Sequence, residues 1–302
     1  MKLPKKVIRC LTIGLFITTS FSFFSCRKLV EIENQNFTPA PVINSIIKAG
    51  EPISVHVSIA SKFDAQEIKV VDNAVVKLFA DDQFIEQLAT FGDGVFVSET
   101  TAEQKIKYEI KVSIPGFSEA VCNAKIPEVT SISEIEHISI AGKNEEGTTY
   151  PAIRFTFHSI PSEEQYFEAR IRLFRSEYEY NADIINIVDP VLLNEGLPLT
   201  VFSNDLITDT TYTMTINYIT GSASSSGGGY YTNLFPFMLE IRSVSKDYYL
   251  FARQKYLYDT GRFPEFGLSS NTAFPLYSNV ENGYGIFIGY SAVVSDTIYP
   301  SY

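Results

Sequence analysis

The sequence predicts a mainly β protein, in which an immunoglobulin-like antiparallel β-sandwich precedes a second antiparallel β domain with one amphipathic helix. Three observations support this fold class. Apolar and polar residues alternate in short runs through residues 42–126 and again from 131 onward, a period typical of half-buried strands. Turn residues such as Gly92-Asp93-Gly94 separate the runs. One segment near residues 245–260 changes to the helical period.

Residues 1–25 are typical of a lipoprotein signal peptide. Several basic residues precede residue 10, and the apolar run from Leu11 to Phe24 has the length of a secretory signal core. The run is shorter than the roughly 20 apolar residues that a transmembrane helix needs. It ends in Phe23-Phe24-Ser25-Cys26, which resembles the lipobox of bacterial lipoproteins. We expect cleavage before Cys26 and lipidation of its thiol, and the alternative is an ordinary signal peptide cut nearby or an uncleaved anchor.

Residues 26–41 are polar and interrupted by proline, as in a tether between the lipid and the first domain.

The cysteine count agrees with cleavage and lipidation at Cys26. Cys10 leaves with the signal peptide and Cys26 carries lipid, so Cys122 alone remains and no intramolecular disulfide can form. Cys122 alternates with Ala120 and Ala124, which predicts a buried structural thiol rather than a nucleophile.

Residues 42–127 form the predicted immunoglobulin-like sandwich. Residues 53–59 and 108–112 alternate strictly between apolar and polar side chains, and the runs between them are equally short. The sandwich should end at Pro127, because the last strand stops there and a segment rich in serine and glutamate follows.

Residues 131–302 form the predicted second domain, which also begins with strands. The runs 212–218 and 237–241 should be the two arms of a hairpin, with the glycine- and serine-rich connector 221–229 as a flexible loop between them. The helix near residues 245–260 follows, with Ser243 or Ser245 as its N-cap and Gly261 at its end. Its apolar face would consist of Tyr249, Ala252 and Tyr256. Two more strands are expected around residues 285–290 and 292–298.

Three segments share their motifs, and the order of those motifs, with a known family. Pro41–Ser45 with Pro52–Val55 opens the series, Phe202-Ser203-Asn204-Asp205-Leu206 follows, and the tail contains Ser278-Asn279-Val280 and then Asn282-Gly283-Tyr284-Gly285. Together they resemble a group of Bacteroidetes outer-membrane lipoproteins, catalogued as domain of unknown function 4249. The resemblance spans nearly the whole chain. It implies an outer-membrane setting, often beside TonB-dependent receptors that import nutrients, and no agreed activity.

The resemblance leaves the membrane face open. Arg27 and Lys28 follow the cysteine, whereas Glu31 and Glu33 come later, which departs from the family's commonest pattern for export to the cell surface. Cell-surface and periplasmic display therefore both remain alternatives.

Composition and residue types exclude several classes of function. The net charge is −11 and basic residues form no stripe, so we expect no nucleic-acid partner. His56, His137 and His158 should all face solvent, which leaves no histidine for a nucleophilic triad. Metal-binding motifs are absent from the sequence, so we expect no metal and no cofactor. The glycines at 283, 285 and 289 miss the dinucleotide fingerprint and should occupy tight turns and crowded strand positions.

Tyr230 and Tyr231 are the candidate ligand contacts. They directly follow the glycine- and serine-rich connector, and an exposed aromatic pair could stack on a glycan or a peptide, whereas packing at a strand edge is the alternative. Together with the setting that the family resemblance implies, the sequence predicts a noncatalytic outer-membrane lipoprotein, an accessory or ligand-binding component associated with TonB-dependent nutrient uptake. The alternatives are a structural or adhesive surface module and a carboxylate-dependent hydrolase.

Overall fold

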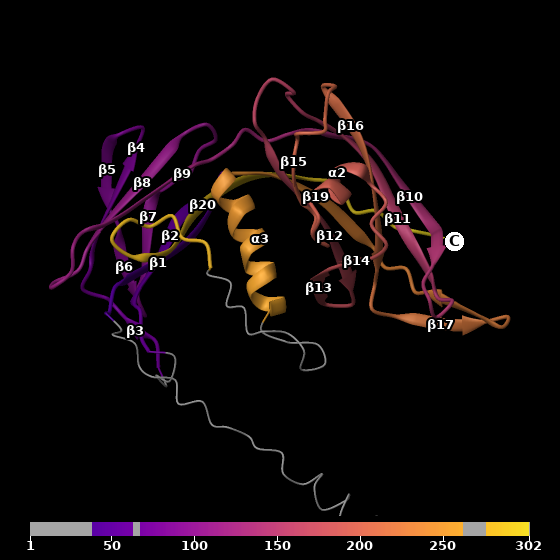
Figure 1. The fold of residues 1–302 in the computed structure, drawn as a ribbon, viewed down its shortest axis with the longest axis horizontal. Coiled ribbons are helices and arrows are strands. Elements are labelled where there is room, and N and C mark those ends of the chain that lie inside the picture. The colour runs from indigo at the N-terminus through magenta and orange to yellow at the C-terminus, as the bar shows by residue number, and fades with distance from the viewer. Residues whose placement is uncertain (1–37, 63–66, 262–275, 302) are drawn as a thin grey trace, which may run out of the picture. The chain divides into compact units, whose positions relative to one another are not determined.

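The computed structural model describes residues 38–62, 67–261 and 276–301, which fold mainly as β-sheets (Figure 1). The predictions of a mainly β fold and of a helix near residues 245–260 are confirmed. The predicted signal peptide, Cys26 and most of the predicted tether lie outside the described residues.

Three larger sheets and one small hairpin make up the described fold. The largest sheet contains, in spatial order, β13 (Tyr178–Asn181), β12 (Tyr166–Arg175), β19 (Phe237–Val244), β20 (Tyr284–Val294), β1 (Pro41–Lys48), β2 (Pro52–Ile59), β7 (Val95–Thr101) and β6 (Ala89–Gly92). β15 (Val201–Ser203) pairs with β12, and β3 (Lys69–Val70) pairs with β2. The second sheet contains β5 (Gln83–Gln87), β4 (Val75–Ala80), β8 (Lys107–Ser113) and β9 (Ala120–Lys125). The third contains β10 (Ile132–Lys143), β11 (Thr149–His158), β16 (Thr211–Ile219) and β14 (Asp183–Ile184).

The first core lies between the second sheet and the β1, β2 and β7 part of the largest sheet, and we call this pair of layers the first sandwich. Val55 and Val57 from β2 pack in it with Leu78 from β4 and Ile110 from β8, all of them fully buried. The period of two predicted these strands because each has one face in this core and the other toward solvent.

The second core lies between the third sheet and the β12–β19 part of the largest sheet. The predicted hairpin between residues 212–218 and 237–241 is wrong. β16 pairs with β11 and β14, whereas β19 pairs with β12 and β20. Both strands carry apolar faces that pack against each other across the core, with the rings of Tyr218 and Phe237 6.1 Å apart, so they lie in facing layers rather than edge to edge. The connector between them forms its own hairpin of β17 (Ala223–Ser226) and β18 (Gly229–Thr232).

A parallel pairing between β1 and β20 joins the two parts of the chain in one sheet. Val42 lies opposite Tyr284, and the pairing continues to Lys48 opposite Tyr290. β20 (Tyr284–Val294) is a single strand in place of the two predicted ones. It continues through Gly289 and Ser291 without a turn, and Ser291 is fully buried within it. Residues Pro39–Tyr302 form one compact unit. The division of the chain at 127–131 stays a prediction.

Two helices are present among the described residues. α3 (Lys246–Gly261) begins after Ser245, whose hydroxyl accepts a hydrogen bond from the Tyr248 amide at 3.2 Å, so Ser245 rather than Ser243 is the N-cap. The short α2 (Pro190–Asn194) was not predicted, although Asp189 caps it and proline occupies its first position. In the described ranges, neither helix is long and apolar enough to cross a membrane.

Candidate functional site

Tyr230 and Tyr231 are exposed on β18, with exposed fractions of 57% and 37%. They lie opposite Ser225 and Ser224, and successive strand residues point to opposite faces, so the two rings do not form one stacking surface. Neither tyrosine lines the cleft described below. Cys26, the other predicted site residue, lies outside the described ranges.

His137 does not face solvent as predicted. Its Nε2 lies 3.0 Å from the hydroxyl of Tyr218, and its ring lies 5.5 Å from that of Phe237. Burial lowers the pKa of His137. The register of β10 shifts between Ser133 and Glu136, and this irregularity turns His137 toward the second core.

His158 is exposed and His56 is partly exposed, on the polar phases of β11 and β2. Cys122 is buried, and burial raises the pKa of its thiol. Among the described residues, no group of three His, Cys, Asp or Glu side chains could hold a metal ion.

A cleft of about 570 Å³ lies between the end of β9 and the start of α3. Asn123 and Lys125 of β9 line one wall, together with Lys105. Residues 163–167, at the start of β12, and residues 243–247, at the start of α3, line the other. The cleft therefore lies where the first sandwich meets the helix and the second core.

Asn279 fixes the first wall. Its amide nitrogen donates to the backbone oxygens of Asn123 at 3.2 Å and Phe287 at 2.8 Å, and its side-chain oxygen accepts from the Phe287 amide at 2.9 Å. Glu281 adds two backbone hydrogen bonds to Val121. The segment that carries the Ser-Asn-Val motif thus fastens β9 to β20.

Asn204 fixes the second wall. Its amide nitrogen donates to the backbone oxygens of Ile160 and Glu163, and its side-chain oxygen accepts from the Gln165 amide at 2.9 Å. Asn204 is buried, so these bonds hold the loop between β11 and β12 in one conformation. The motif around Phe202 and Asn204 therefore shapes the loop that lines the cleft.

Charged side chains of both signs line the cleft. Lys246 donates to Glu164 at 2.9 Å, and the hydroxyl of Tyr166 also donates to Glu164. The hydrogen bonds from Tyr166 and Lys246 lower the pKa of Glu164. Lys105 pairs with Glu128 at 2.8 Å. The cleft can thus offer donors and acceptors to a polar ligand.

A buried hydroxyl lies beside this cleft. Ser243 is one of the lining residues, is 4% exposed, and lies opposite Ser291 in the pairing of β19 with β20. Within the described ranges, the hydroxyl oxygens of Ser243 and Ser291 have no hydrogen-bond partner. Buried hydroxyls normally have a partner, so the unpartnered hydroxyl of Ser243 is an unusual feature of the cleft lining.

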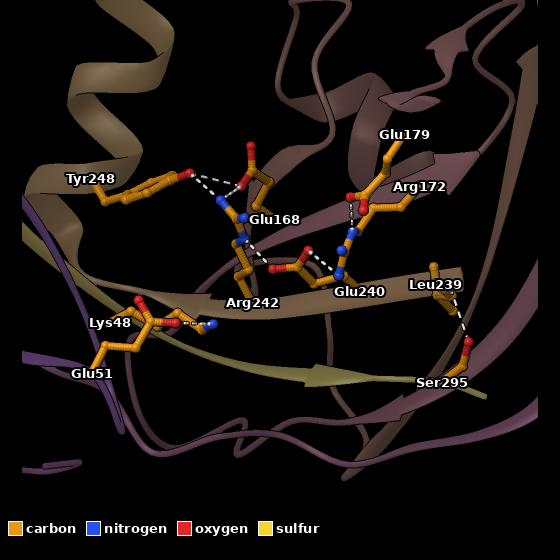
Figure 2. Close-up of polar contacts among 10 residues, drawn as sticks. All are labelled: Lys48, Glu51, Glu168, Arg172, Glu179, Leu239, Glu240, Arg242, Tyr248 and Ser295. Atoms are coloured by element: carbon orange, nitrogen blue, oxygen red, sulfur yellow. Dashed lines mark hydrogen bonds and ion pairs between the residues drawn. The ribbon is translucent and has the colours of Figure 1, made fainter. Parts of the chain in front are cut away.

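A network of charged residues lies on the α3 side of the largest sheet (Figure 2). Arg242 of β19 donates to Glu240 at 2.7 Å, to Glu168 of β12 at 3.2 Å and to the Tyr248 hydroxyl of α3 at 3.1 Å. The Tyr248 hydroxyl donates to Glu168 at 2.7 Å. Arg172 of β12 extends the network, because its Nη1 lies 3.8 Å from Oε2 of Glu240.

This network is largely shielded from solvent, because the side chains of Arg242, Glu240 and Glu168 are 12%, 6% and 19% exposed. Burial alone would lower the pKa of Arg242, but the Tyr248 hydroxyl and the two carboxylates outweigh it and the pKa is raised. Sequence reasoning missed the network, because alternating charges on a strand are usually a solvated face. The nearby charges at 240 and 242 are the signal that could have revealed it.

The comparison with family models confirms the predicted family, domain of unknown function 4249, and the assignment to Bacteroidetes lipoproteins stays a prediction. A family model described as Domain of unknown function (DUF4249) matches residues 28–295. A search of curated proteins gave no match. The matched range contains the segments around Asn204 and Asn279 that build the walls of the cleft. Because the match covers most of the chain, the protein belongs to the Domain of unknown function (DUF4249) family.

Proposed function

We propose that this protein is a lipid-anchored, noncatalytic component of the outer membrane that binds a ligand beside a TonB-dependent receptor during nutrient uptake. The observation that carries the proposal is the amino-terminal sequence, in which basic residues and an apolar run lead directly to Ser25-Cys26. A polar tether and a β-rich body follow. The family resemblance supports the outer-membrane setting.

The cleft between β9 and α3 supports a binding role. The side-chain amides of Asn204 and Asn279 hold its two walls through hydrogen bonds to the backbone. A preorganised site of this kind loses less conformational entropy when a ligand binds. Its lining carries ammonium groups and carboxylates, which suit a glycan or a peptide with charges of both signs. The thiol of Cys122 and the imidazole of His137 do not line this cleft.

Lipidation is tested by growing cells that express the full chain with radiolabelled palmitate. The natural chain should carry label and fractionate with the outer membrane, whereas Cys26→Ser should lose the label. Mass spectrometry should place the mature amino terminus at residue 26. An unmodified amino terminus at another residue would contradict the proposed lipid anchor.

Ligand binding is tested with the mature chain on glycan and peptide arrays. Lys125→Glu reverses a charge in the cleft, and Lys77→Glu is the matched control, because both lysines are exposed on the second sheet and only Lys125 lines the cleft. Binding should weaken at least about tenfold in Lys125→Glu and stay unchanged in Lys77→Glu. Loss of binding in Tyr230→Ser, with binding unchanged in Lys125→Glu, would indicate that the ligand binds at the β17–β18 hairpin and not in the cleft.

Association with a receptor is tested by crosslinking in cells that express the natural protein, followed by purification of the lipidated chain. Recovery of a TonB-dependent receptor in near-stoichiometric amounts is the expected result. Recovery of none, under conditions in which the protein binds its ligand, contradicts the proposed partner.

A further inference from the structure

Large apolar and aromatic side chains are exposed around the start of β1. The exposed fractions are 73% for Ile68, 39% for Val70, 79% for Phe91 and 56% for Tyr284. Single exposed apolar residues are normal on a protein surface. A group of them marks an interaction site when the backbone brings the members together.

Strand pairing brings Val70 and Tyr284 to the same end of the sheet and the same face. Val42 of β1 lies opposite Tyr284 of β20 on one side and opposite Ser58 of β2 on the other, and Ser58 lies opposite Val70 of β3. Directly opposed residues of neighbouring strands point to the same face. Ile68 lies two residues before Val70, just ahead of β3, and is also exposed.

Phe91 joins the group through the hairpin between β6 and β7. Gly94, in the turn of that hairpin, lies against β3, since a Cβ on Gly94 would be 3.2 Å from the Cβ of Val70. The Gly94 amide also donates to Asp72, just after β3, at 2.6 Å. We call Ile68, Val70, Phe91 and Tyr284 the β1-end patch.

The chain enters the fold beside this patch. The described residues begin at Thr38, the Ala40 carbonyl accepts from Ala60 at 2.9 Å, and Pro41 lies opposite Ile59 of β2. β1 and β3 flank β2, so the chain enters two strand spacings, about 10 Å, from β3. Eleven residues lie between Cys26 and Thr38, and the twelve steps from one Cα to the next span at most about 43 Å.

We propose that the β1-end patch docks on the lipid bilayer that holds the Cys26 anchor, with Phe91 and Ile68 among the upper acyl chains and Tyr284 at the headgroups. This inference rests on the proposed lipid anchor. An aromatic and apolar group with a tyrosine is the composition that settles at a membrane interface. A short tether raises the local concentration of lipid at the patch, so a weak insertion is sufficient.

The charges around the patch nearly cancel, with two lysines against three carboxylates. Lys62 and Lys69 are exposed beside it. Glu67, Asp72 and the turn residue Asp93 are exposed there as well. The patch therefore has no strong preference for anionic lipid, and its apolar side chains carry the interaction. Vesicles of phosphatidylcholine are a sufficient probe.

The chain contains no tryptophan, so one introduced tryptophan reports on its own surroundings. Phe91→Trp places the probe in the patch. Phe84→Trp is the matched control, because Phe84 is 57% exposed on β5, which Figure 1 shows at the opposite end of the first sandwich from β3. Chains that begin at Cys26 are coupled through that thiol to a maleimide lipid in the vesicles, while buried Cys122 stays unmodified.

The expected result is a blue-shifted emission of the tryptophan at 91 and at least about twofold quenching by brominated phosphatidylcholine, with little change at 84. Adding Ile68→Asp to Phe91→Trp should remove most of the quenching. Equal quenching at 91 and 84, or none at either position, overturns the docking. Emission at 91 that is blue-shifted before coupling and unaffected by vesicles also overturns it, because another part of the protein would then cover the patch.

Chemical coupling separates this inference from the proposed function. The coupled chain is anchored whether or not cells lipidate Cys26, so absent quenching refutes the docking alone. Absent palmitate labelling in cells refutes the natural anchor, and with it the setting in which the docking would operate.

Discussion

Arg242→Met should destabilise the protein, because it removes the cation from a nearly buried set of carboxylates and keeps most of the aliphatic volume. Breaking a buried ion pair by removing one partner costs about 3–5 kcal/mol. Glu168 is 19% exposed and keeps its hydrogen bond from Tyr248, so we expect the lower end, a loss of about 3 kcal/mol. At roughly 2 °C per kcal/mol for a chain of this size, the melting temperature should fall by about 6 °C.

Urea unfolding followed by circular dichroism measures this loss. Arg154→Met is the matched control, because Arg154 donates to Glu136 at 3.1 Å with both side chains about half exposed, at 49% and 58%. An exposed pair of this kind contributes at most about 1 kcal/mol. The double variant Arg242→Met/Glu240→Gln should recover about 1 kcal/mol or more relative to Arg242→Met, because without Arg242 the buried carboxylate of Glu240 keeps only the longer contact to Arg172, at 3.8 Å.

Two results would refute this reasoning. One is an equal loss of stability in Arg242→Met and Arg154→Met. The other is a large loss in Arg242→Met that Glu240→Gln does not relieve. The second result would assign the contribution of Arg242 to its stacking on the Tyr290 ring, whose centroid lies 4.4 Å from the guanidinium carbon.

Three further predictions concern single buried or crowded positions. Cys122 should react with iodoacetamide at pH 8 far more slowly in the native protein than in urea, because burial raises the pKa of its thiol; similar rates would contradict the buried position. Burial lowers the pKa of His137 in the folded state, so the unfolded state binds its proton first. The unfolding free energy should therefore fall as the pH drops below about 6.5, and His137→Gln should show a smaller fall; identical pH profiles would count against this assignment. Gly285→Ala should cost about 3 kcal/mol or more in urea unfolding, because φ is +109° and a Cβ would lie 2.0 Å from the Ile43 carbonyl oxygen. Gly116→Ala, with φ +87° and open space, should cost only about 1 kcal/mol, and equal losses at the two glycines would exclude the clash as the cause.

Local patterns predicted the strands and the long helix because local physics determines them. Strands such as β2 and β8 have one face in a core, which imposes the period of two on their own residues. Ser245 marks the start of α3 because its hydroxyl accepts from an amide three residues away. The five-residue α2 escaped notice because it is too short to show a period, although Asp189-Pro190 is a recognisable cap.

Pairing between distant strands could not be predicted from one sequence. Residues 42–48 and 284–290 pair in parallel, and neither segment contains a local sign of its partner. The same holds for the charge network, because Glu168 and Arg242 meet only after β12 pairs with β19 and α3 covers the sheet. The walls of the cleft likewise join segments far apart along the chain.

The motifs that indicated the family were visible in the sequence, but their physical role was not. Asn279 and Asn204 look like turn residues in a list of motifs, yet each supplies three side-chain hydrogen bonds to backbone groups of another segment. An asparagine can do this because its amide both donates and accepts. An ionised Asp would lose the two donated bonds of the three, and Leu would lose all three. The motifs therefore supply the side-chain hydrogen bonds that hold β9, β20 and the β11–β12 loop in place. Their hydrogen bonds reach Asn123, Glu163 and Gln165, which line the cleft, so the two asparagines position cleft residues without lining the cleft themselves.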